Sequence, residues 1–256
     1  MIYIATHKKF DVPNLTGYCA LQVGAEGKND FGYLKDNIGN NISEKNANYC
    51  ELTGLYWIWK NVDDSYKGLV HYRRYFGKSN FSNKISDIYT YDYLLECLDH
   101  VDIVLPYVEF FKQNTKEEIL IHCCTEEIFD KLRHIIIAKY PDYIDAYDHY
   151  FDENKTSLFN MIFCKRELFD AYCEWLFSIL FDLEKQVDLT NLNTYQQRLY
   201  GFLSERLLNV WVLKNCFTVR HLPIINVELS VYERIRLVRR RFTNRLRFWI
   251  KSEGKR

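Results

Sequence analysis

The residues of this sequence best suited to chemistry are a histidine and two arginines that follow a short apolar run. The run leads directly into His71, Tyr72, Arg73 and Arg74. A guanidinium group stays charged and offers a planar set of donors that fits phosphate, and a neighbouring imidazole adds a donor near neutral pH. The segment therefore predicts an anion-binding site at a strand end. The alternative is an exposed, charged strand end whose arginines pair with carboxylates.

Several common reaction centres have no counterpart in the sequence. It contains no GxGxxG or GxxxxGK[ST] phosphate loop, no GxSxG turn and no HExxH motif. None of the eight cysteines has zinc-site spacing, so we expect reduced and mostly buried thiols. The acidic pair Asp63-Asp64 precedes the strand and is expected in a solvated turn at its amino end. His122 and Cys123 are neighbours on an expected helix and do not face each other as a catalytic pair.

Strands and helices alternate along the chain. The expected strands are 2–5, 20–23, 69–72, 102–105 and 158–164, and the expected helices are 48–61, 91–98, 117–140, 166–186 and 196–214. This order predicts an α/β fold with a mostly parallel central sheet flanked by helices. In such sheets ligands bind at the carboxyl ends of the strands, where His7, Lys8 and the segment 71–74 fall.

Composition fits a folded globular protein. The chain has 256 residues, 48% of them hydrophobic, and only 10 glycines and 4 prolines. The first residues become charged too soon for a signal peptide, and no apolar run approaches the roughly 18 residues that a membrane span needs. These features predict a cytoplasmic protein.

The formal net charge of zero conceals a division along the chain. Residues 229–256 contain ten Lys or Arg against two Glu, a net charge of +8, which leaves −8 for the rest. Apolar residues recur in this tail at helical spacing, at Val231, Ile235, Val238, Phe242, Leu246 and Trp249. A basic amphipathic helix of this kind is typical of binding to an anionic membrane surface. The alternatives are packing on the body or binding nucleic acid, but the aromatic end at 248–250 favours the membrane, so no nucleic acid is expected.

Five segments, in this order, resemble one family. They are NISEKNANYCELTGLYWIWKN (41–61), YKGLVHYRRYF (66–76), DIVLP (102–106), LFNMIFCKRELFDAYCEWLFSILFDLE (158–184) and RLYGFLSERLLNVWV (198–212). Together they resemble the bacterial capsular and exopolysaccharide glycosyltransferases grouped as domain of unknown function 4422. The resemblance covers residues 1–228, so we expect a glycosyltransferase domain there and a separate basic tail at 229–256.

The resemblance implies a GT-A-like nucleotide-sugar fold. It also implies transfer of a sugar from a nucleoside diphosphate donor to a lipid-linked glycan acceptor, in capsule, exopolysaccharide or O-antigen synthesis. Such an enzyme would be peripheral at the inner face of the cell membrane. The donor would be UDP-linked, and the similarity of some family members to galactofuranosyltransferases points to UDP-galactofuranose, although no residue here selects that sugar.

The resemblance also gives the arginine segment a role. In GT-A enzymes the corresponding strand usually ends in an Asp-x-Asp that holds a divalent cation. Here we expect His71, Arg73 and Arg74 to stabilise the leaving diphosphate instead, with no metal and no cofactor besides the donor substrate. The residues expected to contact the donor are Thr6, His7, Lys8, Asn46, Asn48, Tyr49, Tyr72, Asn160 and Arg198. Asn160 is expected inside an apolar strand, where its amide either binds the sugar or bridges the backbone.

An inverting transferase also needs a carboxylate that takes the proton of the acceptor hydroxyl. Glu205 is the first candidate, on a helix whose apolar positions belong to the core. The alternative for Glu205 is an ion pair with an arginine of its own helix or with Arg198. Glu51 is the second candidate and Asp36 the third.

Two other classes of protein remain open. One is a metal-dependent transferase that uses carboxylates not identified here. The other is a non-catalytic binding protein with a basic tail. Sensitivity to a chelator separates the first class from the predicted enzyme, and a lack of nucleotide-sugar binding would favour the second.

Overall fold

The structure, a computed structural model, describes the backbone of residues 1–253 and the side chains of residues 1–248. Its strands are β1 (Ile2–Thr6), β2 (Tyr18–Gln22), β3 (Leu34–Lys35), β4 (Tyr66–His71), β5 (Arg74–Phe76), β6 (Ile103–Pro106), β7 (Glu109–Phe110), β8 (Lys155–Thr156), β9 (Ile162–Lys165), β10 (Val219–Leu222) and β11 (Ile224–Asn226). Its α-helices are α1 (Asn46–Tyr49), α2 (Leu52–Asn61), α3 (Tyr91–Leu98), α4 (Thr115–His122), α5 (Glu126–Lys139), α6 (Ile144–Asp152), α7 (Arg166–Glu184), α8 (Leu199–Lys214) and α9 (Val231–Glu253).

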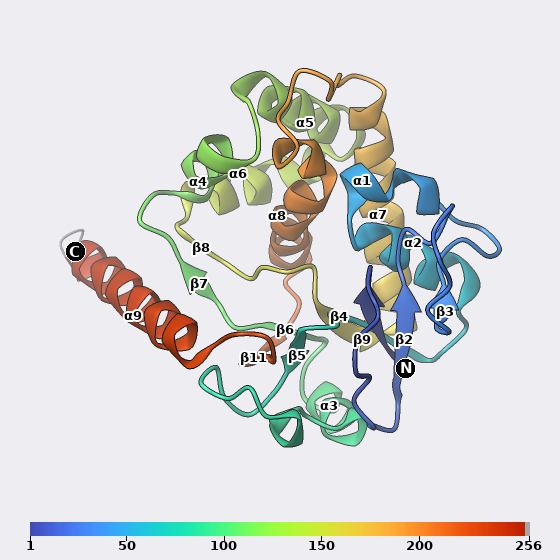
Figure 1. The fold of residues 1–256 in the computed structure, drawn as a ribbon. Coiled ribbons are helices and arrows are strands. Elements are labelled where there is room, and N and C mark those ends of the chain that lie inside the picture. The colour runs from blue at the N-terminus through green and yellow to red at the C-terminus, as the bar shows by residue number, and fades with distance from the viewer. Residues whose placement is uncertain (254–256) are drawn as a thin grey trace.

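A mixed, mostly parallel sheet forms the centre of the molecule (Figure 1). Its strand order is β10-β6-β9-β4-β1-β2-β3, and β5 and β11 extend it beyond the end of β4. β1 pairs in parallel with β2 and β4, whereas β9 runs antiparallel to β4 and β6. The predicted α/β fold is confirmed, with β9 as the antiparallel member between parallel neighbours.

Alternate residues of the strands serve two hydrophobic cores, one on each face of the sheet. Ile2 and Ile4 of β1 pack in the core that contains α3, while Tyr3 and Ala5 pack in the core that contains α2, α7 and α8. Figure 1 shows the larger helical layer on one side of the sheet and α3 on the other. Because both faces are covered, the strand ends are where the sheet can meet a ligand.

Two predicted helices are divided in the structure. The helix expected over 48–61 is interrupted at Cys50, whose φ of 52° lies in the left-handed region, and it becomes α1 and α2. The helix expected over 117–140 becomes α4 and α5 because the Thr125 side chain accepts a hydrogen bond from the Ile128 N–H and begins a new helix. The helix predicted over 91–98 coincides with α3.

The strand predicted over 158–164 begins only at Ile162. Phe159 and Asn160 have φ angles of 79° and 51°, which a strand cannot contain. The prediction that Asn160 lies inside a strand is therefore wrong, although the residue is buried as expected. Asn160 lies instead in a turn before β9, which we call the 159–160 turn.

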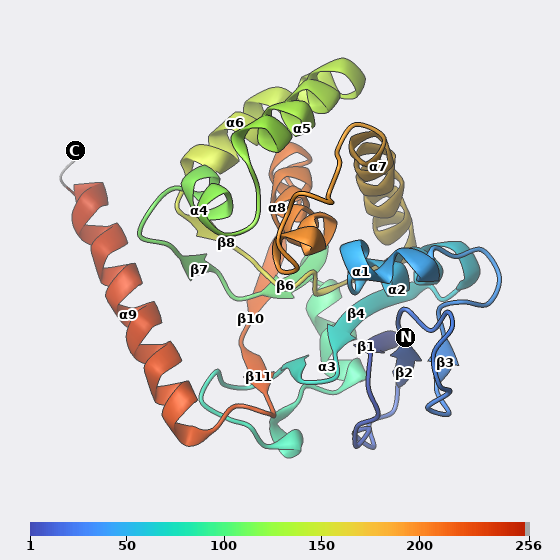
Figure 2. The same cartoon turned by 45° about the horizontal axis from the view of Figure 1, so that its top comes forward.

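Within the basic tail, residues 231–253 form one long helix, α9, at the edge of the molecule beside β7 (Figure 2). Arg241 donates a hydrogen bond to the Glu109 carboxylate at 3.0 Å, and Asn244 donates to the Phe110 carbonyl at 2.8 Å. Phe248 also packs on Phe110, with ring centroids 4.9 Å apart. The helix therefore docks on the body, but not through the apolar stripe that the sequence alternative proposed.

The apolar side of α9 faces away from the body. Val231, Ile235, Phe242 and Leu246 are between 50% and 69% exposed. Trp249, which the sequence places on the same side, lies outside the described side chains. No helix within residues 1–253 is long and apolar enough to cross a membrane.

Candidate active site

The predicted anion-binding segment is a tight β-hairpin. β4 ends at His71, Tyr72 and Arg73 form the turn, and β5 begins at Arg74, which pairs with His71. Residues paired across two strands have neighbouring side chains, so His71 and Arg74 lie together, whereas Arg73 is carried on the turn. The hairpin thus separates Arg73 from His71 and Arg74, and the two sides belong to different groups of side chains.

The first group, which we call the cation group, surrounds Tyr72 at the end of β1. Lys8 Nζ lies 4.8 Å and the Arg73 guanidinium carbon 5.6 Å from the centre of the Tyr72 ring, and the His7 ring packs edge-on at 5.4 Å. Thr6 is buried, and its hydroxyl hydrogen-bonds the backbone of Lys8. Thr6 therefore shapes the turn that presents His7 and Lys8.

Charges from distant parts of the chain also act on His7. Partial burial lowers the pKa of His7, and the charges of Lys8, Arg73, Lys28 and Arg198 lower it further. These four residues come from the end of β1, the hairpin, the loop between β2 and β3 and the segment before α8. Such convergent positive charge suits a polyanion.

One carboxylate lies across the cation group. Glu228 accepts a hydrogen bond from Lys8 Nζ at 2.9 Å, and its other oxygen lies 3.8 Å from Arg73 Nη1. The three side chains are 41% to 49% exposed, so water and salt weaken these pairs. Another anion can therefore displace the Glu228 carboxylate at a low cost in free energy.

The second group, which we call the carboxylate group, is buried where the 159–160 turn meets α8. Glu205 Oε1 accepts from the Phe159 N–H at 2.9 Å, and Oε2 accepts from Arg206 Nη1 at 2.6 Å. Asn160 Nδ2 donates to Glu51 Oε1 at 2.9 Å and to a backbone carbonyl of α8 at 3.0 Å. These bonds hold two non-glycine residues in the left-handed region, a backbone strain that clusters at functional sites.

His71 completes the carboxylate group. Its Nε2 lies 2.6 Å from the Phe159 carbonyl oxygen and 4.0 Å from Glu51 Oε1. Because a carbonyl oxygen only accepts, Nε2 donates in this contact and Nδ1 of the neutral ring is an acceptor. Burial lowers the pKa of His71, so the ring is neutral at neutral pH. His71 therefore offers a second donor to an anion only after protonation.

Arg74 lies beside this group with its donors available. Its guanidinium carbon is 4.6 Å from the centre of the Phe159 ring. Burial and then the Arg73 charge lower its pKa, whereas the charges of Glu205 and Glu51 act in the opposite direction. Among the described side chains Arg74 makes no ion pair.

The three predicted base candidates differ in how their oxygens are used. Both oxygens of Glu205 accept hydrogen bonds, and burial raises the pKa of Glu205. Asp36 is fully buried and accepts from two backbone N–H groups and the Ser43 hydroxyl, so it organises the loop around it. Glu51 uses Oε1 alone, and Oε2 makes no hydrogen bond within the described residues.

The remaining predicted donor contacts lie around α1. Asn46 and Asn48 each donate to a backbone carbonyl, at 2.7 and 2.8 Å, and Tyr49 is fully buried in the core. In the structure these three side chains pack α1 against its neighbours. Arg198 differs, because its Nε donates to Cys50 Sγ at 3.2 Å and its charge reaches the cation group.

Sequence reasoning missed three charged residues of the site, Lys28, Glu228 and Arg206. Glu228 precedes the basic tail and is 220 residues from Lys8, so no local pattern links them. Arg206 follows Glu205 directly, and adjacent helix residues normally point apart. An arginine among the apolar core positions of a helix was the available signal. Within the described residues, no three His, Cys, Asp or Glu side chains converge so as to hold a metal ion.

Comparison with known proteins identifies the family. The family described as Domain of unknown function (DUF4422) matches residues 1–216. The chain belongs to this family. The chain is also similar to a solved structure, the apo form of the bifunctional glycosyltransferase WbbM, with 30% sequence identity and a TM-score of 0.76. The match covers 89% of this chain and 45% of the WbbM chain, so the protein spans about half of WbbM. No curated protein matches the chain.

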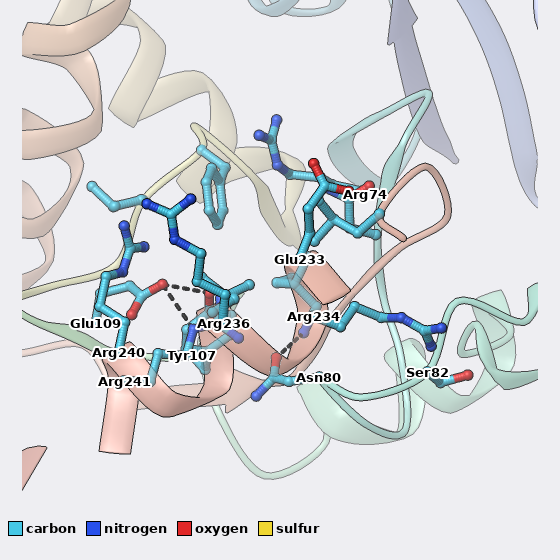
Figure 3. A pocket seen from close by; sticks show the side chains of 16 residues that line it. Arg74, Asn80, Ser82, Tyr107, Glu109, Glu233, Arg234, Arg236, Arg240 and Arg241 are labelled. Atoms are coloured by element: carbon cyan, nitrogen blue, oxygen red, sulfur yellow. Dashed lines mark hydrogen bonds and ion pairs between the residues drawn. The ribbon is translucent and has the colours of Figure 1, made fainter. Parts of the chain in front are cut away.

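The DUF4422 match ends before α9, and α9 encloses a cavity of about 510 Å³ against the body of the protein (Figure 3). Arg74 and Phe159 lie in its wall, so the cavity adjoins the carboxylate group. The other lining residues are Asn80, Ser82, Tyr107, Glu109, Leu158, Ile224, Asn226, Leu229, Glu233, Arg234, Arg236, Leu237, Arg240 and Arg241.

Proposed function

We propose that this protein is a glycosyltransferase that moves a sugar from a nucleoside diphosphate donor to an acceptor hydroxyl. The observation that carries the proposal is the packing of His7, Lys8 and Arg73 around Tyr72, just beyond the carboxyl ends of β1 and β4. Similarity to the bifunctional glycosyltransferase WbbM supports sugar transfer as the reaction. UDP is the proposed nucleotide, and UDP-galactofuranose is the first donor to test.

In this proposal the cation group binds the diphosphate. The acceptor oxygen attacks the anomeric carbon, the bond from that carbon to the diphosphate breaks, and the nucleoside diphosphate leaves with the electron pair. Fixed guanidinium and ammonium groups stabilise the charge that develops on the leaving group. Arg73 and Lys8 belong to the cation group. Arg74 lies beside the carboxylate group, where we propose that the reaction takes place.

The acceptor proton passes to a carboxylate, and Glu51 has the oxygen to take it. Glu51 Oε1 is held by Asn160 while Oε2 is unoccupied among the described residues. Glu205, with both oxygens engaged, holds the 159–160 turn in position. His71 supports the same turn through the Phe159 carbonyl.

The acceptor is proposed to be lipid-linked, in capsule, exopolysaccharide or O-antigen synthesis, and the enzyme peripheral at the inner face of the cell membrane. The exposed apolar side of α9, flanked by arginines, is the supporting observation. A membrane surface brings such an acceptor and the site into contact.

Calorimetric titration with UDP and UDP-sugars, with and without EDTA, tests the donor. Arg73→Ala should weaken UDP binding by roughly tenfold, because one charge-assisted contact is lost. Arg133→Ala is the control, since Arg133 pairs with Asp148 on the distant helices α5 and α6. Glu228→Gln should tighten binding, because it removes the competing carboxylate.

The EDTA arm separates the alternatives. Binding and turnover that survive EDTA support the arginine-based mechanism, whereas their loss would favour a metal-dependent transferase. Absence of binding by every UDP-sugar tested, with the wild-type protein folded, would overturn the central proposal.

A further inference from the structure

The cavity under α9 is positively charged on both of its walls. Five of its lining residues are arginines and two are glutamates, a net charge of +3. Figure 3 shows arginines of α9 on one wall and Arg74 of the hairpin on the other. A cavity with this balance favours an anionic ligand.

Two of the α9 arginines already have partners. Arg241 bonds Glu109 at 3.0 Å and lies 3.9 Å from the centre of the Tyr107 ring, and Arg234 donates to the Phe81 carbonyl at 2.7 Å. These contacts fix α9 to the body. The Arg241 Nη1 atom is nevertheless buried without a hydrogen-bond partner among the described residues.

Arg236 and Arg240, one helical turn apart, also line the cavity. Neither makes a hydrogen bond or an ion pair through its side chain within the described residues. With Arg74 they provide three guanidinium groups whose donors are unused. Guanidinium groups bind phosphate in a bidentate fashion, and several together discriminate strongly for it.

The position of the cavity indicates that its ligand is the acceptor and not the donor. Arg74 and Phe159 line the cavity and also lie at the carboxylate group, where the reaction is proposed to take place. The cation group proposed for the donor lies on the other side, around Tyr72. Leu158, Leu229 and Leu237 add apolar surface next to the arginines.

We propose that the cavity is the acceptor site and that Arg236, Arg240 and Arg74 bind a phosphate group of an amphiphilic acceptor. This inference rests on the proposed transferase function and adds the chemical class of its acceptor. In this proposal the two sides of α9 have different roles. The polar side binds the phosphate group, and the apolar side is free to contact the membrane.

Calorimetry with octyl phosphate tests the inference, on full-length protein saturated with UDP so that the donor side is occupied. Octyl glucoside supplies the same chain without phosphate, and inorganic phosphate supplies the anion without the chain. Arg236→Ala with Arg240→Ala should weaken octyl phosphate binding by roughly tenfold or more. Arg239→Ala with Arg245→Ala removes the same charge from exposed positions that do not line the cavity. This control should change the affinity for octyl phosphate by less than about threefold.

Equal weakening by the two double variants would overturn the inference, as would octyl glucoside binding as tightly as octyl phosphate. Inorganic phosphate binding as tightly as octyl phosphate would assign the cavity to free phosphate and also overturn it. If UDP itself does not bind, the proposed function fails, and the comparison of double variants without UDP still tests the phosphate site.

Discussion

At the scale of single residues, two glutamates in one buried group have different surroundings. Glu205 holds the Phe159 N–H and Arg206. Glu51 is held by Asn160 at one oxygen only. A carboxylate whose two oxygens already accept hydrogen bonds is a support, and one with a free oxygen can accept a proton. On this basis we propose Glu51 as the reacting carboxylate and Glu205 as the positioning one, a distinction that sequence position did not make.

Substitution of each glutamate by glutamine tests these roles. Glu51→Gln should lower kcat by roughly 10²- to 10⁴-fold with little change in stability, because only the proton acceptor is lost. Glu205→Gln should cost stability, about 2–3 kcal/mol, because the buried Arg206 loses its charge partner. Turnover and urea denaturation measured on both variants distinguish the two effects.

The opposite result, in which Glu205→Gln abolishes turnover in a stable protein and Glu51→Gln is active, would exchange the roles. In that case pH dependence gives a second readout. Burial raises the pKa of Glu205, so a base at this position would lose activity as pH falls through a value above the ordinary glutamate range of about 4.3.

His7, Lys8 and Arg73 of the cation group were predicted to lie together because each follows a strand signal. Lys8 and Arg73 end neighbouring parallel strands, and that topology alone brings them to one edge. The role of Glu228 was not predictable, because this residue is 220 residues from Lys8 and only the tertiary fold brings the two together. Asn46, Asn48 and Tyr49 were predicted to contact the sugar donor. In the structure, Asn46 and Asn48 hydrogen-bond backbone carbonyls and Tyr49 is buried in the core. Side-chain type alone cannot reveal these contacts.

At the scale of elements, the sequence predicted which segments are helices and strands better than where they stop. Hydrophobic periodicity continues through Cys50 and through the 159–160 turn, but both places adopt left-handed backbone. At the 159–160 turn, tertiary bonds to Glu51, Glu205 and α8 enforce that conformation, and these bonds join segments more than 40 residues apart. No local pattern contains them.

The contact between β4 and α7 allows a stability prediction for the strand that carries the hairpin. Lys67 is 1% exposed and donates to Asp170 of α7 at 2.6 Å. Asp170→Ala leaves a buried ammonium group without its partner and should cost about 2–3 kcal/mol, somewhat below a fully enclosed pair because Asp170 is 35% exposed.

Urea denaturation provides the measurement, with Asp148→Ala as the matched control. Asp148 pairs with Arg133, and both side chains are about 40% exposed or more, so its loss should cost under about 1 kcal/mol. Equal destabilisation by the two substitutions would show that the Lys67 ion pair does not anchor β4.

At the scale of the whole molecule, the charge division seen in the sequence becomes a spatial arrangement. Residues 229–256 carry +8 and the rest of the chain −8, and within this tail residues 231–253 form a helix at the edge of the body. Among the described side chains of this helix, Arg241 alone pairs with a body carboxylate. Polar contacts fix one side of α9, and four apolar side chains remain exposed on another. We therefore propose that α9 binds an anionic bilayer, whose headgroups would pair with the free arginines and whose interior would cover the exposed apolar surface.

Vesicle sedimentation tests this arrangement. Ile235→Ser with Phe242→Ser should reduce binding to phosphatidylglycerol vesicles by on the order of 100-fold, since two apolar side chains no longer leave water. Ile121→Ser with Ile137→Ser changes two exposed apolar residues of the body and is the matched control. UDP binding should stay unchanged in both.

The arginines add a salt dependence to the same measurement. Each basic residue near an anionic surface contributes about 1 kcal/mol, and salt screens this attraction, so wild-type binding should weaken as salt is raised and be poor on phosphatidylcholine. Vesicle binding that is equal for both double variants and indifferent to lipid charge would exclude α9 as the membrane contact. Because the cavity lies on the opposite side of α9, octyl phosphate binding should survive Ile235→Ser with Phe242→Ser, which separates the two surfaces of one helix.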